Sequence, residues 1–242
     1  MKNNISIGKT LANSFQFLID NFDQKFKEGL PAVLIFTIIF YARSYLISNG
    51  IATNFTIIIF FIITLLVAST IGICVHEEIL NKRKFYFFKE FMSFKSLKYT
   101  FNFLNISLIA FIPLILFFVK SSSLQPESIL IFLIGTIFTM IFSLKLIFIL
   151  PKLTLGLYYK YNIKELNSVG AQLFFLFTII TLIFAVPTLI YFTIQIQLMS
   201  FFKGNYYFLK PLMDIVFFYI YYFNYIVFFA VISYAYKEYS LK

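Results

Sequence analysis

The chain has 242 residues, of which 61% are hydrophobic and only 12% are charged, and its formal net charge is +10. A soluble globular domain is about half apolar and about a quarter charged, so this composition argues against a soluble protein. The positive charge needs no nucleic acid to explain it, because basic residues at the inner surface of a membrane face anionic lipid.

Six stretches are apolar enough to cross a membrane, since a helix needs roughly 20 apolar residues to span the hydrocarbon core. They are continuously apolar and do not alternate every second residue, which excludes the strands of a transmembrane barrel. We therefore predict an all-α integral membrane protein whose residues 1–242 form a single polytopic membrane domain. In chain order, the predicted spans cover residues 29–47, 55–75, 103–119, 128–150, 171–194 and 215–236.

Lysine and arginine are concentrated in alternate connecting segments, and such a positive excess marks the cytoplasmic side of a membrane. Fifteen of the 20 lie in the N-terminal segment, the second and fourth loops and the C-terminal tail, whereas three lie in the other loops. Both termini are therefore predicted to be cytoplasmic. Lys82, Arg83 and Lys84 lie in the second loop, where we expect them to contact anionic lipid.

Two of these basic segments carry nearly the same short motif, F-K-E-F-M-S at residues 88–93 and I-K-E-L-N-S at residues 163–168. A proline follows the lysine of the motif by 24 residues in the first case and by 23 in the second. A looser version of the motif begins at Lys9, and Pro31 follows it by 22 residues. This common register predicts an internal three-fold repeat. The proposed repeats cover residues 5–75, 85–150 and 162–236.

Each repeat is predicted to be an amphipathic helix at the cytoplasmic interface followed by a transmembrane hairpin. The first such helix places apolar residues at spacings of three and four, which put them on one helical face. These residues are Ile7, Leu11, Phe15, Leu18 and Phe22. Helices of this kind lie in the membrane interface with their apolar side down. Pro31 is expected at the first turn of its helix, where proline costs little.

A family resemblance rests on two strings, I-L-P-K-L-T-L-G at residues 149–156 and S-V-G-A-Q-L-F-F-L-F at residues 168–177. In this order of basic helix, hairpin and strings, the chain resembles a group of six-helix bacterial inner-membrane proteins. The membrane domain attached to some glycerophosphodiester phosphodiesterases is the best-named member. The resemblance implies a six-helix fold in the bacterial inner membrane. The catalytic domain of those enzymes has no counterpart in these residues, so we expect no phosphodiesterase activity.

The sequence H-E-E at His76, Glu77 and Glu78 is the most suggestive candidate for catalysis. It begins like the zinc-protease motif H-E-x-x-H, but Leu80 stands where the second histidine is required. It also resembles the E-E-x-x-x-R motif of intramembrane prenyl-protein proteases, with Lys82 in place of the arginine. His76 is the only histidine of the chain. We therefore interpret the segment as a polar helix end and predict no catalytic site, metal or cofactor.

Among the polar residues inside predicted spans, where charged and strongly polar groups are costly and usually functional, three stand out. Arg43 lies in the first span, Lys145 in the fourth and Asn224 deep in the sixth. Lys145, and also Arg43, can extend its side chain to the nearest interface. These three residues form a possible intramembrane polar site.

The leading functional hypothesis is a multi-pass inner-membrane protein without catalytic activity, in a structural or accessory role. Its predicted partners are the bilayer and anionic lipids at the cytoplasmic face, with no nucleic acid. The alternative is a small permease or channel for a lipid-like or apolar solute. A continuous polar cavity lined by Arg43 or Asn224 would favour this alternative.

Overall fold

The computed structural model describes residues 5–51, 53–84, 86–120, 126–157, 169–202 and 206–240 of the chain. Within these ranges, the side chains of residues 111, 113–120, 126–131 and 206–208 are not described. The described part is helical and contains no strand, which confirms the all-α prediction.

The described elements are helices that follow one another through short connections. In order, they are α1 (Ile7–Asp20), α2 (Phe22–Ser48), α3 (Asn54–Asn81), α4 (Phe87–Glu90), α5 (Phe94–Lys120), α6 (Pro126–Leu144), α7 (Ile149–Thr154), α8 (Val169–Phe202) and α9 (Tyr206–Ser240). The longest, α8 and α9, extend over about 50 Å at the rise of an α-helix. Because the hydrocarbon core is only ~30 Å thick, these two helices must tilt or extend into the headgroup region.

Five segments of the described chain are long and apolar enough to cross a membrane. They are Phe22–Ser48, Asn54–Asn81, Phe132–Thr154, Val169–Phe202 and Leu209–Ser240. Each overlaps one of the predicted spans, so the prediction of a multi-pass membrane protein is supported by helix length and composition. The remaining predicted span, 103–119, lies within α5, but most of its outer side chains are outside the described residues. The count of six therefore stays a prediction.

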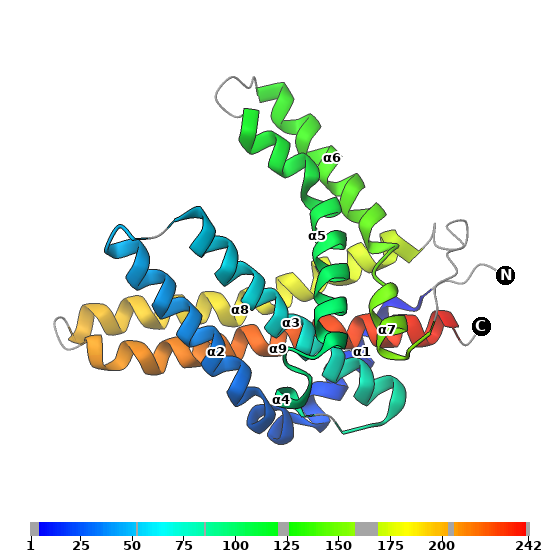
Figure 1. The fold of residues 1–242 in the computed structure, drawn as a ribbon, viewed down its shortest axis with the longest axis horizontal. Helices are drawn as coiled ribbons and strands as arrows, with labels where there is room; N and C mark the ends of the chain where they lie inside the picture. The colour runs from blue at the N-terminus through cyan, green and yellow to red at the C-terminus, as the bar shows by residue number, and fades with distance from the viewer. Residues whose placement is uncertain are drawn as a thin grey trace.

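The long helices form three hairpins, α2–α3, α5–α6 and α8–α9, and Figure 1 shows the α5–α6 hairpin projecting away from the α8–α9 pair. Helices α3 and α9 pack together at the centre of the molecule. Half of the residues in their apolar windows are buried, against 17% in α2 and α8. The second helix of the first and third hairpins therefore builds the core, while the first helix is largely exposed on the outside of the protein.

Glycine allows the closest approaches in this core. A Cβ atom on Gly72 of α3 would lie 2.6 Å from the hydroxyl of Tyr99 and 2.9 Å from the ring of Phe229. A Cβ on Gly29 of α2 would lie 2.4 Å from the ring of Tyr222. Small residues at helix contacts let large side chains pack against a neighbouring backbone, which is the usual means of association in membranes.

The first amphipathic helix exists, but its apolar side packs against the protein. Phe15 of α1 stacks on Phe184 of α8, with ring centroids 6.3 Å apart, and Phe17 is buried. The backbone N–H of Ser6 donates to the carboxylate of Glu238 near the end of α9, over 3.0 Å. The start and the end of the described chain thus lie together, at the base of the bundle. Phe22, which was expected on the same face, belongs to α2 and is exposed.

The elements expected for the repeat are only partly within the described residues. Lys9 lies in α1 and Lys89 in the short α4, whereas Lys164 and residues 162–168 lie outside the described part. The amphipathic segment of the second repeat is not one continuous helix. Met92, with a φ of +63°, separates α4 from α5. The expectation for Pro31 is wrong, because α2 begins at Phe22 and places the proline inside the helix. The three-fold repeat stays a prediction.

Candidate functional site

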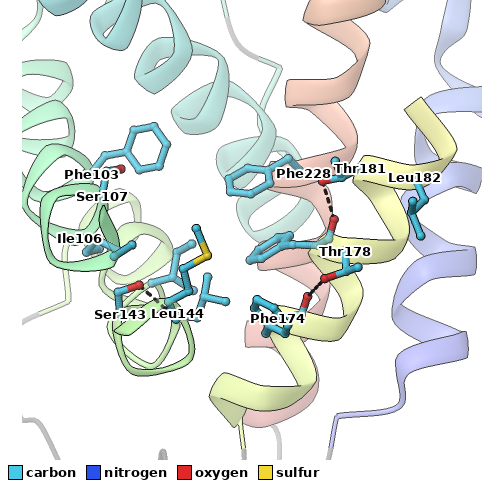
Figure 2. Close-up of a pocket in the computed structure, with 14 residues that line it drawn as sticks. Phe103, Ile106, Ser107, Ser143, Leu144, Phe174, Thr178, Thr181, Leu182 and Phe228 are labelled. Atoms are coloured by element: carbon cyan, nitrogen blue, oxygen red, sulfur yellow. Dashed lines mark hydrogen bonds between the residues drawn. The ribbon is translucent and has the colours of Figure 1, made fainter. Parts of the chain in front are cut away.

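A groove of about 470 Å³ lies between the α5–α6 hairpin and the α8–α9 hairpin. Figure 2 shows its two walls facing each other, with Phe103 and Leu144 on one side and Phe174 and Phe228 on the other. On α6, the lining positions Met140, Ser143 and Leu144 recur at helical spacing, so one face of the hairpin builds its wall, and Ile147 in the following turn continues it. The full lining is Phe103, Ile106, Ser107, Ala110, Met140, Ser143, Leu144, Ile147, Phe174, Phe177, Thr178, Thr181, Leu182 and Phe228.

The few polar groups in this groove are mostly engaged with their own helices. Ser143 Oγ donates to the carbonyl of Met140 over 2.9 Å, and Thr178 Oγ1 donates to that of Phe174 over 2.9 Å. Thr181 Oγ1 donates in the same way to the carbonyl of Phe177. Hydroxyls bonded back into a helix offer little to water. The lining is therefore suited to an apolar occupant.

Near one end of the groove, α8 and α6 make a close backbone contact. A Cβ on Gly170, the second residue of α8, would lie only 2.3 Å from the carbonyl oxygen of Ile141 and 2.9 Å from Cγ of Lys145. Only glycine fits at this separation. Beyond this contact, Thr178, Thr181 and Leu182 are exposed, so the groove opens to the outside of the protein.

His76 lies at the centre of a buried polar cluster that joins three helices. Its Nδ1 is 2.6 Å from Ser233 Oγ of α9, and its Nε2 is 2.8 Å from the hydroxyl of Tyr99 of α5. Ser233 Oγ also lies 2.9 Å from the carbonyl oxygen of Phe229, one turn earlier in α9. A neutral imidazole donates from one ring nitrogen and accepts at the other, so His76 bridges Ser233 and Tyr99 in either tautomer. His76, Tyr99 and Ser233 are completely buried, whereas the sequence analysis placed His76 at an interfacial helix end.

The two glutamates after His76 form ion pairs with lysines of different helices. Glu77 contacts Lys95 at the start of α5, and Asn81 Nδ2 donates to its other oxygen over 2.6 Å. Glu78 contacts Lys25 of α2, whose side chain is only 4% exposed and which also lies 2.8 Å from Glu28. The H-E-E segment thus fixes α3 to its neighbours through all three side chains.

A second buried carboxylate lies toward the opposite end of the bundle. Asp214 of α9 accepts a hydrogen bond from the hydroxyl of Tyr41 of α2 over 2.6 Å, and its Oδ2 lies 3.0 Å from Lys210 Nζ. The hydroxyl of Tyr191 of α8 lies 3.4 Å from its other oxygen. The charge of Asp214 is thus paired with that of Lys210, and the contacts of its carboxylate join α2, α8 and α9.

The three residues of the possible intramembrane polar site do not converge. Arg43 is exposed and five residues from the end of α2, which is about 8 Å by helix rise, well away from mid-membrane. It lines a separate cavity of about 390 Å³ between α2 and α3, whose other lining residues are apolar apart from Thr64. Asn224 is half-buried in α9 and lines neither this cavity nor the groove.

Lys145 lies in the turn between α6 and α7, next in the chain to the groove residue Leu144. Its Nζ stands 5.7 Å from the centroid of the Phe142 ring, and its side chain is half-buried. Lys82, Arg83 and Lys84 are exposed in the loop between α3 and α4, as expected for residues that contact lipid headgroups. Lys82 ends α3 with a left-handed φ of +53°.

Within the described ranges, no group of three or more His, Cys, Asp or Glu side chains could hold a metal. No family model, characterised protein or solved structure matches the chain. The resemblance to six-helix bacterial inner-membrane proteins therefore stays a prediction.

Sequence reasoning missed the groove and the partners of the H-E-E segment. The groove residues are apolar positions in an apolar sequence, and no local pattern separates them from lipid-facing positions. Gly170 was the one available signal, because a glycine in the first turn of a long apolar helix often marks a close helix contact.

Proposed function

We propose that the chain is a multi-pass protein of the bacterial inner membrane with both termini in the cytoplasm, no catalytic activity and a structural or accessory role. Five long apolar helices support the membrane placement. The contact of Ser6 with Glu238 supports a common side for the termini. An even number of membrane crossings would also place both termini on the same side of the membrane.

The complete burial of His76 and Ser233 is the observation that supports the absence of catalysis. In a nucleophilic Ser–His pair, the serine donates its hydroxyl hydrogen to the imidazole and attacks a substrate that reaches both groups. Here Ser233 Oγ also lies 2.9 Å from the carbonyl oxygen of Phe229 in its own helix, so its hydroxyl has a second acceptor besides the imidazole. Because both residues are completely buried, they are out of reach of a substrate.

A fluorophosphonate probe, which reacts with activated serines, tests this proposal. The purified protein is incubated with the probe in lipid nanodiscs, and its peptides are analysed by mass spectrometry. We expect no adduct on Ser233, as in the His76→Ala variant, which removes the imidazole beside this serine. An adduct on Ser233 that disappears in His76→Ala would overturn the proposal and indicate a hydrolase.

The second candidate is a small permease for a lipid-like solute, and the apolar groove favours it. The groove is open to the outside of the protein and lacks the charged groups that an ion pathway requires. A vesicle assay with a fluorescent phospholipid, quenched from outside by dithionite, separates the two candidates. Transport requires loss of inner-leaflet fluorescence from protein-containing vesicles and its retention in protein-free vesicles. A structural or accessory protein gives the same fluorescence in both.

A further inference from the structure

The groove between the two hairpins has a shape that fits one hydrocarbon chain. A water molecule takes about 30 Å³ of liquid volume, so 470 Å³ corresponds to roughly fifteen such molecules. A methylene group is similar in size, and the groove therefore has room for a single acyl chain. The hydroxyls of Ser143, Thr178 and Thr181 already donate to their own helices, so they offer water only acceptor oxygens in a mostly apolar lining.

The groove lies in one half of the membrane. Its lining on α8 extends from Phe174 to Leu182, which is about 8 to 20 Å from the first residue of that helix. The base of α8 is the end at which α1 and the last turn of α9 also lie. With the proposed orientation this half is the cytoplasmic leaflet, whose hydrocarbon reaches the exposed Thr178, Thr181 and Leu182 directly.

A positive charge lies beside the end of the groove that is nearest the base of α8. Lys145 follows the lining residues Ser143 and Leu144, and its stem packs beside Gly170, where α6 and α8 meet. A phospholipid chain in the groove has its phosphate at the membrane surface, which is the same end. Anionic lipids of the cytoplasmic leaflet are favoured near such a lysine.

We propose that the groove holds one acyl chain of an anionic phospholipid from the cytoplasmic leaflet, with the lipid phosphate at Lys145. The acyl chain packs between Phe103 and Phe174 and fills the space that separates the two hairpins there. This inference rests on the membrane placement and orientation of the proposed function. It is independent of the absence of catalysis.

The absence of tryptophan from the chain makes a direct test possible. The variant Phe174→Trp places a single fluorophore in the groove wall, and Phe175→Trp places one on the adjacent, 55% exposed position of the same helix as a matched control. Phe103→Trp probes the other wall, so that the test does not depend on one substitution. Each variant is reconstituted in phosphatidylcholine vesicles that contain a minor fraction of a lipid with brominated chains, either phosphatidylglycerol or phosphatidylcholine.

Bromine quenches tryptophan on contact, so quenching reports which lipid touches each position. We expect the groove tryptophans to be quenched as if brominated phosphatidylglycerol were enriched about fivefold over the bulk, which is the preference that one lysine gives. Phe175→Trp should follow the mole fraction for both lipids. Adding Lys145→Gln should remove the enrichment at Phe174→Trp, whereas Lys145→Arg should retain it.

Two results would overturn the proposal. Equal quenching of groove and control tryptophans by both lipids would mean that the groove selects no lipid. Groove tryptophans that resist quenching while Phe175→Trp is quenched would mean that protein fills the groove. A serine adduct in the fluorophosphonate experiment would leave these readings unchanged, so the two proposals fail separately. If reporter fusions showed the opposite orientation in the membrane, the groove would lie in the other leaflet and the assignment to the cytoplasmic leaflet would be wrong.

Discussion

His76 Nδ1 and Ser233 Oγ lie 2.6 Å apart and connect α3 to α9 where both side chains are completely buried. Tyr99 of α5 occupies the other ring nitrogen. In a membrane interior, apolar side chains do not distinguish a neighbouring helix from lipid, so directional hydrogen bonds are among the few interactions that specify which helices meet. The one histidine of the chain therefore sets the arrangement of the core.

Replacing His76 with alanine should destabilise the protein strongly. The substitution removes the hydrogen bond of the buried Tyr99 hydroxyl to the imidazole, at a cost of about 1–3 kcal/mol, and leaves Ser233 with only its bond to Phe229. Cys74 is the only cysteine, so a dye that becomes fluorescent on reaction with thiols can follow unfolding of the purified protein on heating. Tyr86→Phe, which removes a hydroxyl from a side chain 73% exposed, is the control and should melt like the wild type. Equal melting of all three proteins would refute the role assigned to His76.

The ion pair of Lys25 with Glu78 should be more costly to break than a surface pair. The Lys25 side chain is 4% exposed, and removing one partner of a buried pair costs about 3–5 kcal/mol because a charge is left uncompensated. Glu28 also contacts Lys25, so Glu78→Gln should give the lower part of this range. Thermal unfolding of Glu78→Gln, compared with Lys27→Gln on the exposed side of α2, measures the effect. A double variant that also carries Lys25→Met should recover part of the loss; a further loss would contradict the pairing.

Gly170→Ala should separate α6 from α8. The added Cβ meets a backbone carbonyl at 2.3 Å, which cannot move independently of its helix. Overpacking of this kind costs about 1–3 kcal/mol. Gly8→Ala is the matched control, because no atom lies within 4 Å of its Cβ and alanine favours the helix. We expect a lower melting temperature for Gly170→Ala and an unchanged or higher one for Gly8→Ala. The same temperature for both would show that the two hairpins do not meet at Gly170.

Reporter fusions test the orientation. A fusion after Lys84 should read cytoplasmic, and a fusion after Asn49, at the end of α2, should read external. Alkaline phosphatase is active only outside the cytoplasm and green fluorescent protein only inside, so paired fusions at each site give opposite signals. A reversed pair at either site would contradict the proposed topology.

The presence of several membrane-spanning helices could be predicted from the sequence. Runs of about 20 apolar residues must be helices in lipid, because every backbone polar group has to be satisfied within its own segment. The order of the long helices could therefore be predicted, but most of them extend several residues beyond a predicted span limit. Pro31 shows where this reasoning stops, because it was expected at a helix start and lies inside α2. The helix begins at Phe22, seven residues before the predicted span. Its polar first turns are held by the ion pairs of Lys25. Polar residues that find partners in the fold extend a helix beyond its apolar run.

What only the tertiary structure decided is which faces of these helices meet. Lipid-facing and protein-facing positions are both apolar, so helices such as α8 and α9 carry little periodic signal from which a face can be read. The sequence alone indicated neither that His76 would meet Ser233, 157 positions away, nor that Phe103 and Phe174 would line one groove. Those relationships depend on shape, on the close approach that Gly72 and Gly170 permit and on the pairing of a few buried polar groups. These properties emerge only when the helices are packed together.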